Sequence, residues 1–128
     1  MITEQIRHLL RNAPFIFVAS TDSSGQPHMA VGEQVAVTHD SQLVFENLFC
    51  PVTLQNISGN SHVTVVVFDP VTGVGYQMLG SVARNSDASV HDAADVPDDQ
   101  AVLTRFSVKV HRLLEFSNGI HSDIPLGS

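Results

Sequence analysis

The sequence contains few basic residues. Lysine and arginine together number 6, against 13 aspartates and glutamates, so the formal net charge of the 128 residues is −7. Neither basic type occurs between residues 12 and 83. A nucleic-acid interface uses such cations to displace counterions from phosphates, so the composition argues against a nucleic-acid partner. The same shortage disfavours attachment to an anionic membrane surface.

Cysteine and long apolar runs are also scarce. Cys50 is the single cysteine, so no internal disulfide can form, which is typical of a reducing compartment. No apolar run is long enough to cross a bilayer, and the N-terminus lacks a signal-peptide pattern. We therefore expect a cytoplasmic protein without a membrane partner, folded as one domain over residues 1–128.

Two short helices are predicted. Ile2, Ile6, Leu9 and Leu10 recur at helical spacing, and the segment must end before Pro14. The second helix is expected over residues 51–58. Proline favours the first position of a helix, and the glycine at position 59 can take the left-handed conformation that ends one.

The remaining apolar segments read as strands joined by polar turns. Residues 85–100 are acidic and aperiodic, so we expect an exposed connection there, with room for one helical turn. The tail from residue 117 onward is expected to be weakly structured. Closure of such a chain into an antiparallel barrel leaves few exposed strand edges. The six predicted strands are 15–21, 27–38, 43–46, 63–68, 74–84 and 106–116.

The order and separation of several segments resemble the FMN-binding split β-barrel family related to pyridoxamine 5'-phosphate oxidase and to small FMN-binding proteins. The resemblance covers nearly the whole chain and implies a mainly β fold, a six-stranded antiparallel split β-barrel (Greek key) with one or two short helices. The segments that carry it are Phe17-Val18-Ala19-Ser20-Thr21, Gly25-Gln26-Pro27-His28, Leu43-Val44-Phe45, Thr53 with Asn56, and Gly75-Tyr76-Gln77-Met78-Leu79-Gly80.

This resemblance implies a homodimer with one flavin mononucleotide (FMN) at each cofactor site on the subunit interface. The second strand would lie along the flavin ring, and residues 46–54 would surround the ribityl chain and phosphate. Thr53 matches the phosphate-contacting threonine or serine of the family. The implied cofactor-binding residues are Val31, Gly32, Glu33, Gln34, Asn47, Val52, Thr53, Leu54 and Gln77.

The chain departs from the family pattern at two places. Val52 stands where a lysine or arginine generally adds charge near the phosphate, and Arg84, Arg7, Arg11 or the partner subunit would have to compensate. Residues 115–123 lack the basic side chains that grip the substrate phosphate in the oxidases themselves. We therefore expect a reaction other than that of a true pyridoxamine 5'-phosphate oxidase.

Some individual residues admit two interpretations. Glu33 shares the phase of Met29, Val31 and Val35 on the second strand, so its carboxylate would need a partner, a bulge or a cofactor cavity. Cys50 is either a small buried hydrophobe or a thiol affected by the helix dipole. Thr53 is either an ordinary helix residue or the phosphate contact. The seven histidines show no metal-ligand spacing, so no metal site is predicted.

Three functional hypotheses follow. The first is an FMN-dependent oxidoreductase or electron carrier with an unidentified small-molecule substrate or redox partner and no assignable catalytic residue. The second is a split-barrel dimer with a weakened flavin site, acting as a non-enzymatic ligand-binding or structural module. In the third, a deazaflavin or a haem replaces FMN, with His28, His62 or His111 as candidate axial ligands.

Overall fold

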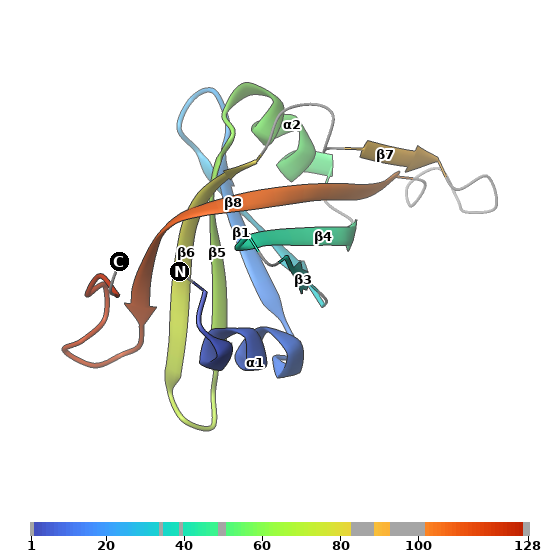
Figure 1. Cartoon of the computed structure of the whole chain (residues 1–128). Coiled ribbons are helices and arrows are strands. Elements are labelled where there is room, and N and C mark those ends of the chain that lie inside the picture. Colours follow the sequence, from blue (N-terminus) through green and yellow to red (C-terminus); the bar gives the residue numbers. More distant parts are fainter. Residues whose placement is uncertain are drawn as a thin grey trace.

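The computed structural model describes residues 2–33, 35–38, 40–48, 51–82, 89–92 and 102–126. Within these ranges it contains two helices and eight strands, and the two predicted helices are confirmed (Figure 1). None of the described helices has the length and apolar character needed to span a membrane. The elements are α1 (Glu4–Asn12), β1 (Ile16–Thr21), β2 (Pro27–Gly32), β3 (Val35–Val37), β4 (Gln42–Leu48), α2 (Pro51–Gly59), β5 (His62–Asp69), β6 (Val74–Val82), β7 (Ser89–Asp92) and β8 (Val102–Phe116).

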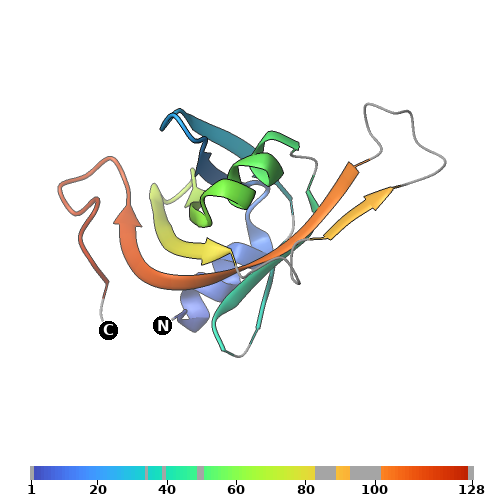
Figure 2. The same cartoon turned by 90° about the horizontal axis from the view of Figure 1, so that it is seen from above.

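The strands form one antiparallel sheet in the order β2-β1-β5-β6-β8-β4-β3, with β7 paired to β8 beside this path. Strands β2 and β3 lie at opposite ends of that order, yet residues 33 and 34 alone separate them in the chain. The sheet must therefore curl until its two ends approach each other, as the curved strands of Figure 2 show. Strands β5, β6 and β8 lie side by side in the sheet in the order in which they occur in the chain, and β4, which precedes them in the chain, lies on the other side of β8. This is a Greek-key arrangement. The expected mainly β, split-barrel fold is confirmed.

The number of strands differs from the six predicted. The predicted strand over residues 27–38 is divided into β2 and β3, and the chain bends at Glu33 between them. The acidic connection contains β7, whose Ser89–Asp92 pairs with the first residues of β8. Strand β8 begins before the predicted residue 106, and its extension offers backbone N–H and C=O groups that β7 satisfies. The remaining residues of that connection, 85–88 and 93–100, lie outside the described part of the chain.

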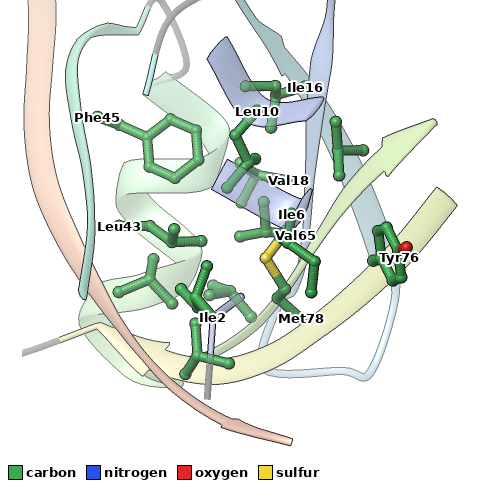
Figure 3. Packing of buried hydrophobic residues seen from close by; sticks show 14 of the residues in the cluster. Ile2, Ile6, Leu10, Ile16, Val18, Leu43, Phe45, Val65, Tyr76 and Met78 are labelled. Atoms are coloured by element: carbon green, nitrogen blue, oxygen red, sulfur yellow. The ribbon is translucent and has the colours of Figure 1, made fainter. Parts of the chain in front are cut away.

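The hydrophobic core fills the inside of the curled sheet. Helix α1 begins after Thr3, whose hydroxyl accepts a hydrogen bond from the Ile6 N–H at 3.3 Å. The buried face of this helix projects Ile6 and Leu10 between the strands (Figure 3). The rings of Phe45 on β4 and Phe106 on β8 stack with centroids 5.2 Å apart. The core thus joins the β4 side of the barrel to the strands on the other side.

The C-terminal tail is more ordered than predicted. It folds back along the end of β8, where the Asp123 N–H donates to the Glu115 carbonyl at 2.7 Å and the Leu126 N–H donates to the Leu113 carbonyl at 2.9 Å. Asp123 takes a positive φ of 66°, which lets the chain reverse direction. The turn needs little apolar sequence, which is why hydrophobic periodicity does not reveal it.

Candidate functional site

Helix α2 is held against the inner side of β1 by polar side chains. Asn56 is buried and donates from Nδ2 to the Ser20 Oγ at 3.1 Å. Asn60, just past the helix, donates from Nδ2 to the Thr21 Oγ1 at 3.1 Å. These contacts fix the inward face of α2, which carries the predicted phosphate-contacting Thr53.

Thr53 is fully buried, and its Oγ1 has no hydrogen-bond partner among the described residues. Leaving a buried hydroxyl unsatisfied costs about 1 to 3 kcal/mol, so native proteins rarely do so without reason. The neighbouring Val52 is 45% exposed and Leu54 is partly buried. Among the described side chains of residues 51–54, therefore, Thr53 alone combines burial with an unused polar atom.

A hydroxyl on the first turn of a helix suits a phosphate. Threonine can donate to a phosphate oxygen, and the N-terminal end of a helix favours negative charge. Pro51 lacks an N–H, so the donors on this turn are the backbone amides of the residues after it and the Thr53 hydroxyl. The residues present therefore fit the phosphate end of a flavin nucleotide in chemistry. Residues 49 and 50, which lead into the helix, lie outside the described ranges, and Cys50 with them.

The predicted ring-contacting residues of the second strand lie on two faces. Gly32 is buried, whereas Val31 is 51% exposed and Glu33 is also exposed. A regular strand would point Glu33 into apolar surroundings, but the chain bends at this residue. Beyond the bend, Val35 on β3 packs against the core, so the odd-numbered positions change from the outer face to the inner face at Glu33. The bend is thus the local departure from regular strand geometry that keeps the Glu33 carboxylate out of the core. Gln34 lies outside the described residues.

Val31 and Gln77 share one row across the outer face of the sheet. Val31 pairs with Phe17, Phe17 with Val66, and Val66 with Gln77. Gln77 also donates from Nε2 to the Asp123 Oδ1 of the tail at 2.5 Å. Thr53 lies on the inner side of the sheet, so a single chain does not bring all the predicted cofactor residues together. Asn47 lies on β4, but its side chain is outside the described part of the structure.

Two of the three arginines proposed to compensate for Val52 are engaged elsewhere. Arg7 donates to the Thr38 carbonyl at 3.2 Å and to the Val37 carbonyl at 3.5 Å. Arg11 pairs with Glu4 at 2.9 Å on the surface. This pair lowers the pKa of the Glu4 carboxyl, first through the hydrogen bond from Arg11 and then through its charge. Arg84 lies outside the described residues, and the contacts of Arg7 and Arg11 are made away from α2.

Sequence reasoning missed a cavity of about 450 Å³ on the outer face of the sheet. His62, His111 and Arg112 line it together with apolar residues of β1 and β6. The Ser81 Oγ lies 2.9 Å from the His111 Nε2. A register shift between Leu79 and Gly80 of β6 marks a bulge in its pairing with β8. Adjacent residues of a regular strand face opposite ways, so the pattern of the sequence gave no sign that His111 and Arg112 share a cavity.

The described residues hold no group of three or more histidine, cysteine, aspartate or glutamate side chains placed to bind a metal ion. The chain matches the sequence pattern of the family described as pyridoxamine 5'-phosphate oxidase over residues 2–113. A comparison with curated protein sequences finds no match.

Solved structures share the fold at low sequence identity. HupZ of Group A Streptococcus is 18% identical with a TM-score of 0.71, covering 97% of this chain and 99% of HupZ. A pyridoxamine 5'-phosphate oxidase-related, FMN-binding protein of Nostoc punctiforme is 14% identical with a TM-score of 0.65, covering 91% of this chain and 84% of that protein. HutZ, the heme storage protein of Vibrio cholerae, is 8% identical with a TM-score of 0.58, covering 88% of this chain and 93% of HutZ.

Proposed function

The chain belongs to the pyridoxamine 5'-phosphate oxidase family, and from this premise we propose that it is a flavoprotein that binds FMN and passes electrons or hydride to a small molecule. The observation that carries the proposal is the buried, unpartnered hydroxyl of Thr53 on the first turn of α2. A phosphate oxygen would give that hydroxyl the partner it lacks. Bound flavin supplies the redox chemistry, while the protein binds and orients it. The fold likeness to an FMN-binding protein of Nostoc punctiforme supports the same cofactor.

We also propose that the protein is a cytoplasmic homodimer with the cofactor at the interface. Four large apolar side chains on or next to β1 and β2 have at least a third of their area exposed. We call this group the outer apolar patch. Exposed apolar side chains that gather on one face are typical of a protein interface. A second subunit would also allow one flavin to contact both the inner helix α2 and the outer row that contains Val31 and Gln77. The patch consists of Phe15, Phe17, Met29 and Val31.

Replacing Thr53 by valine tests the phosphate contact. Valine has nearly the same shape but no hydroxyl, so removal of an unsatisfied polar atom should leave the unliganded protein as stable as the original or more so. Affinity for FMN should fall about tenfold or more, whereas affinity for riboflavin, which lacks the phosphate, should stay unchanged. Flavin fluorescence quenching measures both affinities, and thermal unfolding measures stability.

The control for this experiment is Val52→Thr, which places a hydroxyl on the adjacent, exposed position of the same helix turn. If the phosphate contact belongs to the buried position 53 alone, this exposed hydroxyl should change the ratio of the FMN and riboflavin affinities less than Thr53→Val does. Ser58→Ala, which removes an exposed hydroxyl from the same helix outside the implied cofactor-binding set, should leave that ratio unchanged. Equal losses of both ligands in Thr53→Val would remove Thr53 from the phosphate site. Absence of quenching by either ligand in the original protein would overturn the FMN proposal itself.

Replacing Val31 by aspartate tests the dimer. A charge in the middle of the outer apolar patch should be tolerated by a monomer but not at a desolvated interface, so we expect the variant to elute as a monomer. Light scattering coupled to size exclusion measures the mass. Val71→Asp is the matched control, because Val71 lies on the turn between β5 and β6 and its side chain is 91% exposed. This variant should remain dimeric. A monomeric mass for the original protein would contradict the proposal.

Haem is a second candidate cofactor. His62 and His111 line one cavity, and HutZ, which has this fold, is a heme storage protein. His28 lies on β2 and is not among the residues that line that cavity. The absorbance spectrum of the purified protein separates flavin bands from a haem Soret band. A colourless protein that binds neither would favour the non-enzymatic module.

A further inference from the structure

We propose that the outer-face cavity is a binding site for a small anionic ligand with an apolar body, separate from the FMN phosphate site at α2. Its volume of about 450 Å³ lies within the range of small-molecule sites. The inference does not depend on FMN binding, and it assigns the cavity to a small ligand in place of the haem considered above. It rests on the positions of the Arg112 guanidinium, the imidazoles of His62 and His111, and several apolar side chains, all of which line the same cavity.

The polar side of the cavity comes from three strands. His62 begins β5, and Ser81 of β6 lies directly opposite it in the sheet. The Ser81 hydroxyl lies within hydrogen-bond distance of the His111 imidazole on β8, which restrains the orientation of that ring. Arg112 faces Leu79 on the same side. The three nitrogen-bearing side chains therefore meet at one place although β5 and β8 are far apart in the sequence.

The bulge explains why two neighbouring residues of β8 reach the same cavity. His111 and Arg112 are consecutive and both exposed, and both line the cavity. The extra residue in β8 opposite Leu79 and Gly80 re-aims one of them, which is what bulges commonly do at the edges of binding sites. A regular strand would have turned one of these two side chains into the core.

Charge complementarity points to an anion. Among the described residues, the cavity lining includes no aspartate or glutamate, and the Arg112 side chain makes no ion pair or hydrogen bond. Asp22 follows the cavity-lining Thr21, but its Oδ1 accepts hydrogen bonds from the Ser24 hydroxyl at 2.7 Å and from the Gln26 N–H at 2.8 Å. These bonds lower the pKa of the Asp22 carboxyl and keep it within its own turn. An unpaired guanidinium in an acidic protein is thus left to face the cavity.

The apolar side of the cavity selects the rest of the ligand. Ala19, Val63, Leu79 and Pro27 supply its carbon surface. A planar ring or short hydrocarbon can lie on these side chains while a carboxylate or phosphate reaches Arg112 and His111. Arginine binds both groups with two parallel N–H donors, so the chemistry shared by a carboxylate and a phosphate ester defines the ligand class.

The cavity is distinct from the Thr53 site. The Ser20 side chain points to the inner side of β1, where Asn56 of α2 donates to it. Ser20 also lines the cavity, together with Thr21 of β1 and Thr64 of β5, whereas Thr53 is not among the lining residues. A ligand in the cavity would therefore lie beside β1 without contacting Thr53.

Titration with three aromatic probes tests the site in protein to which no flavin is added. Phenyl phosphate and benzoate carry the anion, and benzyl alcohol is the neutral control with the same ring. We expect at least one anionic probe to bind at millimolar concentrations and to shift the imidazole proton resonances of His62 and His111. The neutral probe should bind about tenfold more weakly. The tighter of the two anionic probes identifies phosphate or carboxylate as the preferred group.

Variants of two exposed cations on β8 make the test specific. Arg112→Gln should weaken the preferred anionic probe about tenfold to a hundredfold, because it removes a charge-assisted contact. Lys109→Gln removes the same charge from an exposed β8 residue that does not line the cavity, and affinity should change by less than about twofold. Equal losses in both variants, equal binding of the neutral probe, or no shift of either imidazole would overturn the site. Displacement of bound FMN by phenyl phosphate would overturn its separation from the flavin, whereas failure of FMN to bind would leave the probe result intact.

Discussion

Replacing Phe45 by alanine is expected to lower the free energy of unfolding by about 3 to 5 kcal/mol, the usual range for removing a buried aromatic side chain. Phe45 is 1% exposed and stacks on Phe106 at 24° between ring planes. Both rings belong to paired strands, since Phe45 on β4 lies opposite Phe106 on β8. The loss therefore combines a cavity in the core with a weaker joint between β4 and the rest of the sheet.

Urea denaturation followed by circular dichroism measures this change. Ile120→Ala is the control, because Ile120 is 91% exposed in the tail and its truncation should alter stability by less than about 0.5 kcal/mol. A similar small change in Phe45→Ala would mean that the aromatic pair does not sit in the core as described. The comparison also separates core packing from a general effect of lost apolar area.

Replacing Gly80 by alanine is expected to destabilise the protein by about 1 to 3 kcal/mol, and more if the backbone cannot yield. A Cβ atom at this position would lie 2.3 Å from the Lys109 carbonyl oxygen and 2.9 Å from the Val108 Cγ1. The first neighbour is backbone of the paired strand β8, which cannot rotate away as a side chain can. The strands must separate next to the bulge that places His111 and Arg112 in the cavity.

Gly59→Ala is the matched control for this prediction. A Cβ added at Gly59, the last residue of α2, would meet nothing within 4 Å, and its φ lies outside the left-handed region. That variant should be as stable as the original or slightly more so, because alanine restricts the unfolded chain. Both variants are compared by urea denaturation and by phenyl phosphate titration. Unchanged stability in Gly80→Ala would show that β6 and β8 are not in close contact there.

The sequence predicted those parts of the fold that depend on local signals. The apolar spacing around Ile6 and Leu10 predicts α1, and Pro51 with Gly59 predicts the bounds of α2 to within one residue. The division of the second predicted strand was not visible, because Val31 and Val35 have the same residue type and parity but face opposite sides. Strand β7 was missed because its pairing depends on the extension of β8 rather than on its own residues.

The candidate site was predictable only in part. The resemblance directed attention to Thr53, and its buried hydroxyl is the feature that a ligand would explain. The cavity, in contrast, depends on the register between β6 and β8 and on the bulge opposite Gly80, which are relations between distant segments. His62 and His111 are unremarkable in the sequence because neither has a ligand-like neighbour at a fixed spacing.

The position of β8 also determines the order in which the barrel can assemble. Strand β4 pairs with β3 and with β8, and β8 alone connects that pair to β6 and the strands beyond it. Until the last strand is added, the earlier strands form two separate antiparallel groups linked by the bend at Glu33 and by helix α2. Pairing between such distant segments is slow, because the chain loses entropy on closing the long loop between them before the new contacts can stabilise the pair. Barrel closure is therefore a late, non-local event, and the core around Phe45 and Phe106 is completed with it.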